Sequence, residues 1–404
     1  MKRTHTVAIL GHGVVGRGVC DLITNNQREL VHYLGCEVKI AHILDLRDFP
    51  DSPYGELVTH LFDDILLDES VETVIEAMGG SHPAYEYTVA ALSAGKNVIT
   101  SNKEVVANFG DEFVRLAAEN GVSYRFEAAV GGGIPVIAPM LSSIRQNKIV
   151  EVRGILNGTT NYILTKMFTY GDSFESALSD AQALGYAEKN PDADILGTDS
   201  ARKIAILTAL ALDMLPDVGE IHTEGITGIR AADVRFAESI GHRIKLLGRC
   251  IANGGKPVVC VAPFLIPCES PLASVNGVYN AVEIVAEPLG NVMFYGQGAG
   301  AGATASAIVG DMIPIVTGGG YNPIVPGFNK AEHFIRAEFS KFSSRFYIAA
   351  DEKHKEELTV LLECEPYSEK GGEVIFITKE MTEKEMNALT EGFEGELLSK
   401  IRFI

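Results

Sequence analysis

The stretch HTVAILGHGVVGRGVCDLI, residues 5–23, decides the fold class. A short β-type apolar run leads into three spaced glycines, and a helical pattern follows them. This order is typical of a dinucleotide-binding unit, because the glycines let the backbone approach a pyrophosphate at the helix N-terminus. A glycine turn without a ligand is the alternative. The candidate cofactor-binding residues of the turn are Gly11, Gly13, Val14, Val15 and Gly16.

More strand-like runs follow this unit along the chain. They read VKIAHILD, VETVIEAMGG, KNVITSN and VSYRFEAAV, and the helical segments PAYEYTVAALSAG and DEFVRLAAENG separate the later ones. Strands that alternate with helices predict a parallel, doubly wound sheet. The sequence therefore predicts an α/β fold with a Rossmann-type nucleotide domain.

Two charged residues at the end of the second predicted strand bear on the choice of nucleotide. Asp45 stands where an acidic residue would bind the ribose 2′-hydroxyl of NAD, although a longer first connection places it later than usual. Arg47 could instead accept the 2′-phosphate of NADP. The sequence leaves both choices open.

Four further candidates lie at the carboxyl ends of predicted strands, where open α/β sheets bind their ligands. Gly79 and Gly80 close the VIEAMGG strand, and the segment TSNKE places Ser101 and Lys103 just past the next strand. We expect these residues to face the cofactor or the substrate. For Lys103, a solvated surface lysine is the alternative.

Composition and charge set outer bounds on the class of protein. A length of 404 residues predicts two or three domains. With 34 basic and 53 acidic residues, the net charge of −19 should repel phosphate backbones and anionic membranes, so we expect neither as a partner. Six cysteines without a CxxC pair are interpreted as reduced thiols, and no signal peptide or membrane helix is recognised. We therefore expect a cytoplasmic protein.

The segment FEAAVGGGIPVI places Glu127 before three successive glycines and Pro135. Such glycines permit backbone carbonyls to turn toward one point, where a neighbouring carboxylate would complete an oxygen cage for a hard cation. A plain interdomain hinge is equally compatible. The residues alone favour the hinge.

The acidic segment NPDADILGTDSARK precedes an apolar helical run, IAILTALAL. Asp192, Asp194 and Gly197 fit the first half of a calcium-loop pattern. The second half fails, because Leu196 and Lys203 occupy positions that need oxygen ligands. The acidic residues need another explanation.

Asp199 and Lys203 are four residues apart, so they share one face if a helix begins just before them. A capped helix with a surface salt bridge would account for this pair. It leaves three carboxylates unexplained, at Glu188, Asp192 and Asp194. Clustered carboxylates suit a cationic substrate group such as the ammonium of an amino acid.

A dehydrogenase that acts on an alcohol needs a group to take the hydroxyl proton as hydride leaves. Lys203 can do this if burial or a second cation, such as Lys103, lowers its pKa, whereas Asp199 would act in the opposite direction. The segment LNGTTNYIL adds Asn157 and Thr159 as small hydrogen-bonding side chains, for which helix capping is the alternative.

Together these segments resemble the homoserine dehydrogenase family over roughly residues 5–330. The matching segments are GHGVVG, TSNKE, EAAVGGGIPVI, LNGTTNYIL and AQALGYAEKNPDADILGTDSARK, in that order. The resemblance implies the interconversion of homoserine and aspartate 4-semialdehyde with NAD or NADP, in threonine, methionine and isoleucine biosynthesis.

The resemblance also implies roles for single residues. Lys203 would be the acid/base with Lys103 assisting, and Glu188 and Asp199 would hold homoserine with Asp194 beside them. The nicotinamide side would contact Gly185 and Gly300, and a monovalent cation, Na⁺, would bind Glu127 and the carbonyls of Val130, Gly132 and Ile134. This raises the cation interpretation over the hinge.

The domain layout is likewise implied by the resemblance. An NAD(P)-binding domain spans residues 1–150 and is completed by about 296–330, and a mixed α+β substrate-binding and dimerisation domain spans 151–295. Residues 335–404 are similar to a shortened ACT domain, so threonine inhibition is not expected and a packing role is the alternative. The early glycine turn leaves no room for an N-terminal aspartate kinase. We expect a monofunctional enzyme that forms a homodimer or a higher homo-oligomer.

Two other functions compete with this one. Another lysine-dependent Rossmann dehydrogenase would share the turn and the lysines, but the acidic segment favours an amino substrate. A catalytically weak regulatory protein that binds NAD(P) and an amino acid would keep the fold without turnover. The presence of Lys103, Asp199 and Lys203 argues against it.

Overall fold

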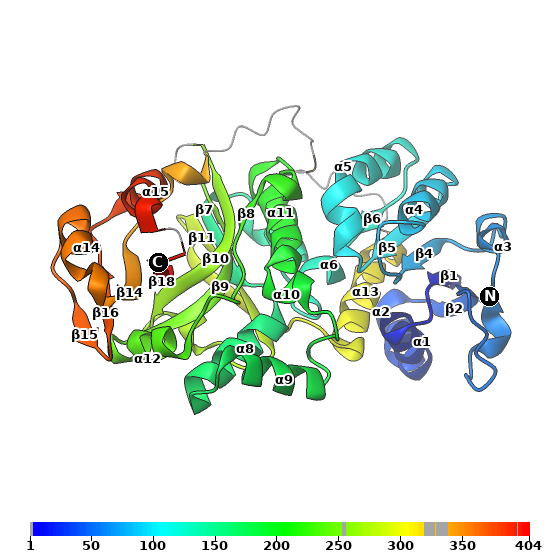
Figure 1. Ribbon diagram of the computed structural model, residues 1–404. Coiled ribbons are helices and arrows are strands. Elements are labelled where there is room, and N and C mark those ends of the chain that lie inside the picture. The colour runs from blue at the N-terminus through cyan, green and yellow to red at the C-terminus, as the bar shows by residue number, and fades with distance from the viewer. Residues whose placement is uncertain (1–2, 253–255, 319–327, 329–337, 394) are drawn as a thin grey trace. The chain divides into compact units, whose positions relative to one another are not determined.

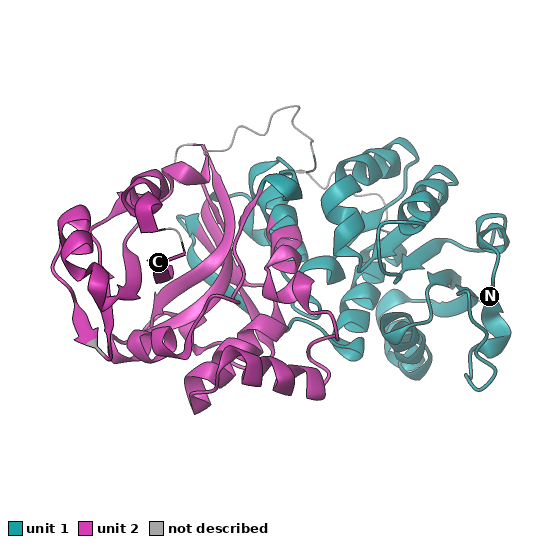
Figure 2. Cartoon of the chain, in the orientation of Figure 1, with its two compact units in different colours: residues 1–149, 205–220, 286–334 teal, residues 150–204, 221–285, 335–404 magenta. Residues whose placement is uncertain are grey.

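The computed structural model of the protein describes residues 3–252, 256–318, 328, 338–393 and 395–404 (Figure 1). The chain forms two compact units (Figure 2). Unit 1 contains residues 1–149, 205–220 and 286–334, and unit 2 contains residues 150–204, 221–285 and 335–404. The division into nucleotide, substrate and ACT-like domains stays a prediction.

Unit 1 is built on a six-stranded parallel sheet with the order β3-β2-β1-β4-β5-β6. The predicted doubly wound α/β fold is therefore confirmed. The chain changes direction across the sheet between β1 and β4, and ligands bind at such a switch point. The strands are β1 (Thr4–Leu10), β2 (Glu37–Leu44), β3 (Val58–Thr59), β4 (Thr73–Glu76), β5 (Asn97–Thr100) and β6 (Tyr124–Arg125).

Helices cover this sheet, and one of them comes from late in the chain. In Figure 1, α13 lies beside α1 and α2, and its Ile308 and Met312 share a buried core with Val7 and Ile9 of β1. Residues 319–327 and 329–330 of the predicted completing segment lie outside the described residues. The helices are α1 (Val14–Asn25), α2 (Gln27–Leu34), α3 (Phe62–Leu66), α4 (Ala84–Ser93), α5 (Lys103–Glu119), α6 (Ala128–Gly131), α7 (Ile137–Pro139) and α13 (Ala301–Val316), which follows strand β12 (Gly290–Gln297).

Unit 2 is built on a mixed sheet with the order β11-β7-β9-β10-β18-β14-β16-β15, and β8 also pairs with β10. Its strands are β7 (Lys148–Ile155), β8 (His222–Thr223), β9 (His242–Ile251), β10 (Val258–Pro267), β11 (Tyr279–Glu287), β14 (Phe346–Asp351), β15 (Ser368–Lys370), β16 (Glu373–Ile377) and β18 (Leu397–Phe403). The helices are α8 (Gly158–Tyr170), α9 (Phe174–Ala183), α10 (Asp192–Ile195), α12 (Ala231–Ser239), α14 (Lys355–Leu362) and α15 (Glu383–Thr390). Helix α11 (Thr198–Leu212) begins in unit 2, and its residues from 205 onward belong to unit 1.

The C-terminal tail follows the predicted order of strand, helix, strand, helix and strand, as β14, α14, β16, α15 and β18. Its strands and helices enclose a small apolar core that includes Phe346, Leu358, Phe376 and Met386. The last strand, β18, runs parallel to β10 and pairs Arg402 with Phe264. The tail is therefore continuous with the sheet of unit 2. A two-stranded sheet of β13 (Ser343–Ser344) and β17 (Met381–Thr382) lies in the same region.

The six cysteines are free thiols, as predicted, and four of them are buried. Within the described ranges, no helix has both the length and the apolar character that a bilayer crossing requires.

Candidate active site

The glycine turn between β1 and α1 is closely packed main chain. Gly11 has a φ of +95°, and a Cβ at Gly16 would lie 1.9 Å from the carbonyl oxygen of Gly11. Gly13 is the N-cap of α1, and a Cβ there would meet no atom within 4 Å. Packing therefore requires glycine at Gly16, whereas Gly13 leaves open space at the helix N-terminus, the end of a helix that attracts anions. Val14 beside it is exposed, and Val15 is half-buried.

Asp45 follows β2 and contacts the glycine turn through a hydrogen bond. Its Oδ2 accepts the N–H of His12 at 2.9 Å, and Arg47 donates from Nε to Oδ1 at 3.0 Å and from Nη2 to Oδ2 at 3.2 Å. The N–H of Arg47 also donates to Oδ1. Burial acts to raise the pKa of Asp45, but the hydrogen bonds from Arg47 and His12 prevail and lower it to about 2. The carboxylate is thus ionised at neutral pH.

The ends of β4 and β5 lie together, so the turns that follow them share one edge of the sheet. Gly80 has a φ of +79°, and its carbonyl accepts a hydrogen bond from Nδ2 of Asn102 at 2.8 Å. Asn102 also caps α5, whose first residue is the half-buried Lys103. The N–H of Ser101 donates to the carbonyl of Glu76. Gly79 stands next to Gly80 and has open space around it.

Sequence reasoning missed two residues at this edge, Asn102 and Glu76. An asparagine directly before a helical run is a typical N-cap, and that signal would have identified Asn102. Glu76 is fully buried at the end of β4 and accepts hydrogen bonds from the N–H of Met78 and the hydroxyl of Thr100. Burial raises its pKa to about 7, although these hydrogen bonds act in the opposite direction.

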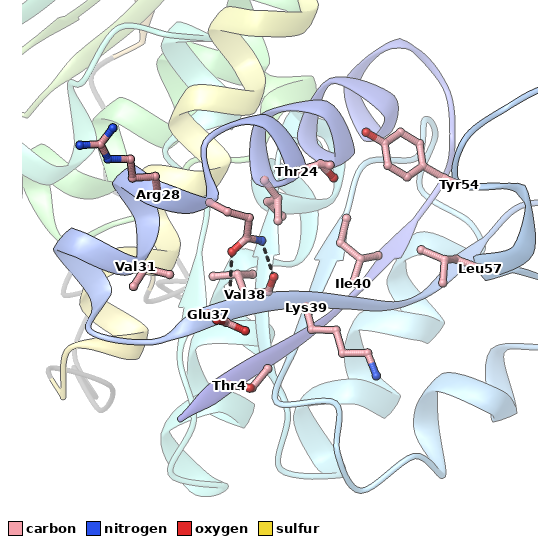
Figure 3. A pocket seen from close by; sticks show the side chains of 12 residues that line it. Thr4, Thr24, Arg28, Val31, Glu37, Val38, Lys39, Ile40, Tyr54 and Leu57 are labelled. Carbon is pink, nitrogen blue, oxygen red and sulfur yellow. Dashed lines mark hydrogen bonds between the residues drawn. The ribbon is translucent and has the colours of Figure 1, made fainter. Parts of the chain in front are cut away.

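A pocket of about 770 Å³ also lies in unit 1, and it is distinct from the glycine turn (Figure 3). Thr4 and Glu37, the first residues of β1 and β2, line it, whereas the turn follows the last residue of β1. The side-chain amide of Gln27 bonds to both the N–H and the carbonyl of Val38 at this strand edge. The pocket contains none of the predicted cofactor-binding residues.

Glu127 is a buried carboxylate that anchors the start of α7. Its Oε1 accepts the N–H groups of Val136 and Ile137, and its Oε2 accepts the N–H of Ala138 at 2.7 Å. Burial raises the pKa of Glu127 against these hydrogen bonds. The carbonyls of Val130, Gly132 and Ile134 were predicted to join a cation site. These residues lie between Glu127 and the three amides, Val130 in the short helix α6 and the other two in the turn that follows it. No group of three or more His, Cys, Asp or Glu side chains in the described part of the chain has metal-site geometry.

Four of the predicted site residues of unit 2 form one hydrogen-bonded network: Asn157, Asp194, Asp199 and Lys203. Nζ of Lys203 lies 2.8 Å from Oδ2 of Asp199 and donates to the carbonyl of Leu156 at 2.7 Å. Nδ2 of Asn157 donates to Oδ1 of Asp194 at 2.6 Å and to Oδ2 of Asp199 at 3.0 Å. The network thus joins side chains from three segments: the start of α8, α10 and α11.

The predicted pairing of Asp199 and Lys203 is confirmed, but the alternative of a surface salt bridge is wrong. Asp199 is 3% exposed and Lys203 is 7% exposed. The helix begins at Thr198, after Gly197 with a φ of +87°, so Asp199 lies inside the first turn. A buried ion pair requires further hydrogen-bond partners to offset its desolvation, and Asn157 and the carbonyl of Leu156 supply them.

Asn157 is a helix cap, as the alternative interpretation of this residue predicted, and it also contacts the aspartates. Its Oδ1 caps α8 by accepting the N–H of Thr160 at 2.9 Å, while its Nδ2 reaches the two aspartates. Thr159 faces a different turn and donates to the carbonyl of Tyr186 at 2.7 Å. One side chain therefore fixes both the helix start and the carboxylates.

Glu188 and Gly185 lie on an exposed turn after α9. The carbonyl of Glu188 accepts a hydrogen bond from Gln182, but its carboxylate is not part of the network of Asn157, Asp194, Asp199 and Lys203. Gly185 has a φ of +74°. Gly300 belongs to unit 1, where it is the N-cap of α13.

Two family models match this chain. The model described as "Homoserine dehydrogenase, NAD binding domain" matches residues 11–127, and the one described as "Homoserine dehydrogenase" matches residues 135–313. The first identifies an NAD binding domain over residues 11–127, a range that includes the glycine turn. The second covers the buried network of unit 2.

Relatives and solved structures agree with these models. A homoserine dehydrogenase of Bacillus subtilis is 39% identical over 315 residues, 77% of this chain and 72% of the relative. That of Synechocystis is 42% identical over 322 residues, 78% of this chain and 73% of the relative. The crystal structure of a homoserine dehydrogenase from Thiobacillus denitrificans has a TM-score of 0.92 and 32% identity, and covers 100% of this chain and 99% of its own. A hyperthermophilic archaeal homoserine dehydrogenase mutant in complex with NADPH has a TM-score of 0.67 and 27% identity, over 77% of this chain and 97% of its own.

Proposed function

This chain belongs to the homoserine dehydrogenase family, and from that premise we propose which side chains carry the reaction. The activity is the NAD(P)-dependent interconversion of L-homoserine and L-aspartate 4-semialdehyde, in amino-acid biosynthesis. The nicotinamide supplies the hydride chemistry when it is bound. The protein must hold the amino acid, orient its hydroxyl group and move one proton.

The buried network around Lys203 is the observation that carries this proposal. In the oxidative direction, the uncharged amine of Lys203 takes the hydroxyl proton of homoserine, and in the reverse direction its ammonium form returns that proton to the aldehyde oxygen. Asp199 and the carbonyl of Leu156 fix the amine at 2.8 and 2.7 Å. The family resemblance is the ground for giving Lys103 an assisting role.

The carboxylates of the network are proposed to bind the α-ammonium group of homoserine. Asp194 and Asp199 are held by one amide, that of Asn157, so their spacing is set before substrate arrives. Such fixed carboxylates form strong charge-assisted hydrogen bonds with an ammonium group. Glu188 is proposed to approach the substrate from its exposed turn.

The pair of Asp45 and Arg47 is proposed to favour NADP. The two oxygens of Asp45 accept four hydrogen bonds from Arg47 and His12, which is the full capacity of a carboxylate. The ribose 2′-hydroxyl of NAD would have to displace one of them. The Arg47 side chain is 66% exposed and is a suitable partner for a 2′-phosphate.

A monovalent cation, Na⁺, is proposed to bind at Glu127 with the carbonyls of Val130, Gly132 and Ile134. Oε2 of Glu127 accepts one amide and keeps acceptor capacity, which supports the proposal. A cation here would stiffen the turn between Glu127 and α7. Adding NaCl in place of choline chloride should raise the thermal midpoint of the protein, and Glu127→Gln should abolish that difference; equal midpoints in the native chain would refute the site.

The assembly is proposed to be a homodimer or a higher homo-oligomer, as in the family resemblance. Light scattering on a size-exclusion column gives the mass directly. A single species of about 43 kDa would contradict the proposal.

The initial rate of absorbance change at 340 nm tests the function itself. Homoserine should produce a substrate-dependent rate, faster with NADP than with NAD. A 2-hydroxy acid and a polyol serve as control substrates without the ammonium group. Folded protein that binds cofactor and gives no homoserine-dependent rate would instead support the catalytically weak regulatory protein.

A further inference from the structure

The last strand of the chain carries a buried arginine that clamps a carboxylate far away in the sequence. Arg402 is fully buried, and its Nη1 and Nη2 donate to the two oxygens of Glu224 at 2.7 Å each. Its Nε donates to Glu383 on α15, and its guanidinium lies 5.1 Å from the ring centre of Phe339. A two-pronged arginine–carboxylate pair of this kind fixes orientation as well as charge.

The electrostatics keep the pair of Arg402 and Glu224 charged at neutral pH. Burial acts to raise the pKa of Glu224, but His222 and Arg402 prevail and lower it to about 2. His222 lies 2.7 Å from Glu224 and stacks on Phe339. Glu224 therefore stays ionised and paired.

Glu224 is also the start of a main-chain segment that packs against α10. Its own N–H donates to the carbonyl of Val261 on β10. A Cβ at the next residue, Gly225, would lie 2.1 Å from the carbonyl oxygen of Ile195, and the N–H of Ile226 donates to that same carbonyl at 2.9 Å. The segment 224–226 is thus in direct contact with the end of α10.

The turn that segment 224–226 contacts lies between Asp194 and Asp199 of the network. It runs from Ile195 to Gly197, directly after Asp194 and two residues before Asp199. A Cβ at Gly197 would meet the carbonyl oxygen of Glu224 at 3.2 Å. Any shift of Glu224 would therefore move the backbone that sets the distance between these carboxylates.

We propose that Arg402 is a positioning residue for the amino acid substrate. It holds Glu224, Glu224 holds the 195–197 turn, and the turn sets the spacing of Asp194 and Asp199. The inference rests on the proposed function, because it assigns Arg402 a role through the substrate site named there. It also gives the C-terminal tail a function: the tail serves the substrate site as part of one sheet.

A second arginine of unit 2 provides a matched control. Arg230 donates to Asp233 at 2.8 Å and to Glu373 at 2.9 Å, and Asp233 also accepts from Tyr347 and Ser399. These partners tie α12 to the tail strands β14, β16 and β18. They do not include the segment 224–226 or the 195–197 turn. Loss of Arg230 should loosen the tail without moving the aspartates.

The test compares Arg402→Met, Arg402→Lys and Arg230→Met in the full chain. We expect Arg402→Met to raise KM for homoserine by between about 10- and 100-fold with little change in KM for the cofactor, because small displacements of binding groups are costly. Arg402→Lys should recover part of this loss, since lysine restores the charge but cannot bond both oxygens. Arg230→Met should lower the thermal midpoint while KM for homoserine stays within about twofold.

Equal KM values in Arg402→Met and the native chain would overturn the inference, and so would equal increases in both arginine variants. If Arg402→Met does not fold, Glu224→Gln tests the same link, with an expected rise in KM of about tenfold; no rise there overturns the inference. A native chain without homoserine-dependent turnover would overturn the proposed function first and this inference with it, so the two failures are distinguishable.

Discussion

The glycine turn of unit 1 is built from main chain, whereas the polar network of unit 2 is built from side chains. The turn is a surface of main chain, in which Gly16 packs against the carbonyl of Gly11 because Gly16 has no side chain. The network is made of side chains, in which Asn157, Asp199 and Lys203 hold one another by hydrogen bonds. The first suits a ligand recognised by its phosphates, and the second suits one recognised by its charge and its hydroxyl group.

The comparison teaches that the two regions should fail in different ways. A substitution in the turn alters backbone packing, so it should affect folding and cofactor binding together. A substitution in the network removes one chemical group, so it should affect the homoserine step while the cofactor still binds.

The largest effect is expected at Lys203. Lys203→Ala should lower kcat by about 10² to 10⁴-fold, because general acid/base catalysis contributes that much, while the affinity for cofactor stays unchanged. Steady-state rates at 340 nm and calorimetric cofactor titration measure the two quantities. Lys203→Arg keeps the charge but cannot release its proton, so it should lose as much. Near-normal turnover in Lys203→Arg would exclude the lysine as the base.

Gly16→Ala should abolish cofactor binding and lower the free energy of unfolding by about 3 kcal/mol or more, since the added Cβ would lie 1.9 Å from the carbonyl oxygen of Gly11. Gly13→Ala is the matched control, because its Cβ would have no neighbour within 4 Å. We expect Gly13→Ala to have the same thermal midpoint as the native chain. Its affinity for the cofactor should be lower, because the methyl group occupies the space proposed for the phosphate. Unchanged cofactor affinity in Gly13→Ala would show that the phosphate lies elsewhere.

Arg47→Ala should lower kcat/KM for NADP by about tenfold and leave that for NAD within twofold, because one charge-assisted contact to the 2′-phosphate is lost. The ratio of the two rates, measured at equal homoserine concentration, reports the preference. An equal decrease of kcat/KM with both cofactors would show that Arg47 positions Asp45 and does not contact the 2′-phosphate.

The smallest effect is a change in how stability depends on pH at Glu76. Burial raises the pKa of this carboxyl from its ordinary 4.5 to about 7. Its contribution to stability is therefore fully present below about pH 4.5 and is lost as the pH rises through about 7. Glu76→Gln removes this titration, so the native chain should lose stability relative to the variant between pH 5 and 7.5. Urea unfolding midpoints at several pH values test this; parallel curves would contradict it.

Much of unit 1 could be predicted from the sequence because its constraints are local. The order of strand, glycine turn and helix follows from steric rules that act within twenty residues, and alternating elements gave the parallel sheet. The pairing of Asp199 with Lys203 was predictable for the same reason, since a helix brings residues four apart together. The N-cap at Asn102 also follows from a local signal, an asparagine directly before a helical run, although it was not predicted.

The substrate network depends on packing that no local rule contains. Asn157 and Asp194 are 37 residues apart, and they meet because α8 begins beside α10. The burial of Lys203 and the contact of Arg402 with Glu224, 178 residues away, likewise arise from tertiary structure. Resemblance to a family identified the residues of the network. The structure shows the hydrogen bonds between them and the contacts of Glu224 with the 195–197 turn.

The central claim is that the carboxylates of the network select the ammonium group of the substrate. The most direct test is the ratio of kcat/KM for homoserine to that for 4-hydroxybutanoate, which has the same hydroxyl and carboxylate groups but no amino group. We expect a ratio of at least about 10³, because a site built for one charged group rejects the analogue that lacks it. Comparable values for the two compounds would contradict the assignment of Asp194 and Asp199.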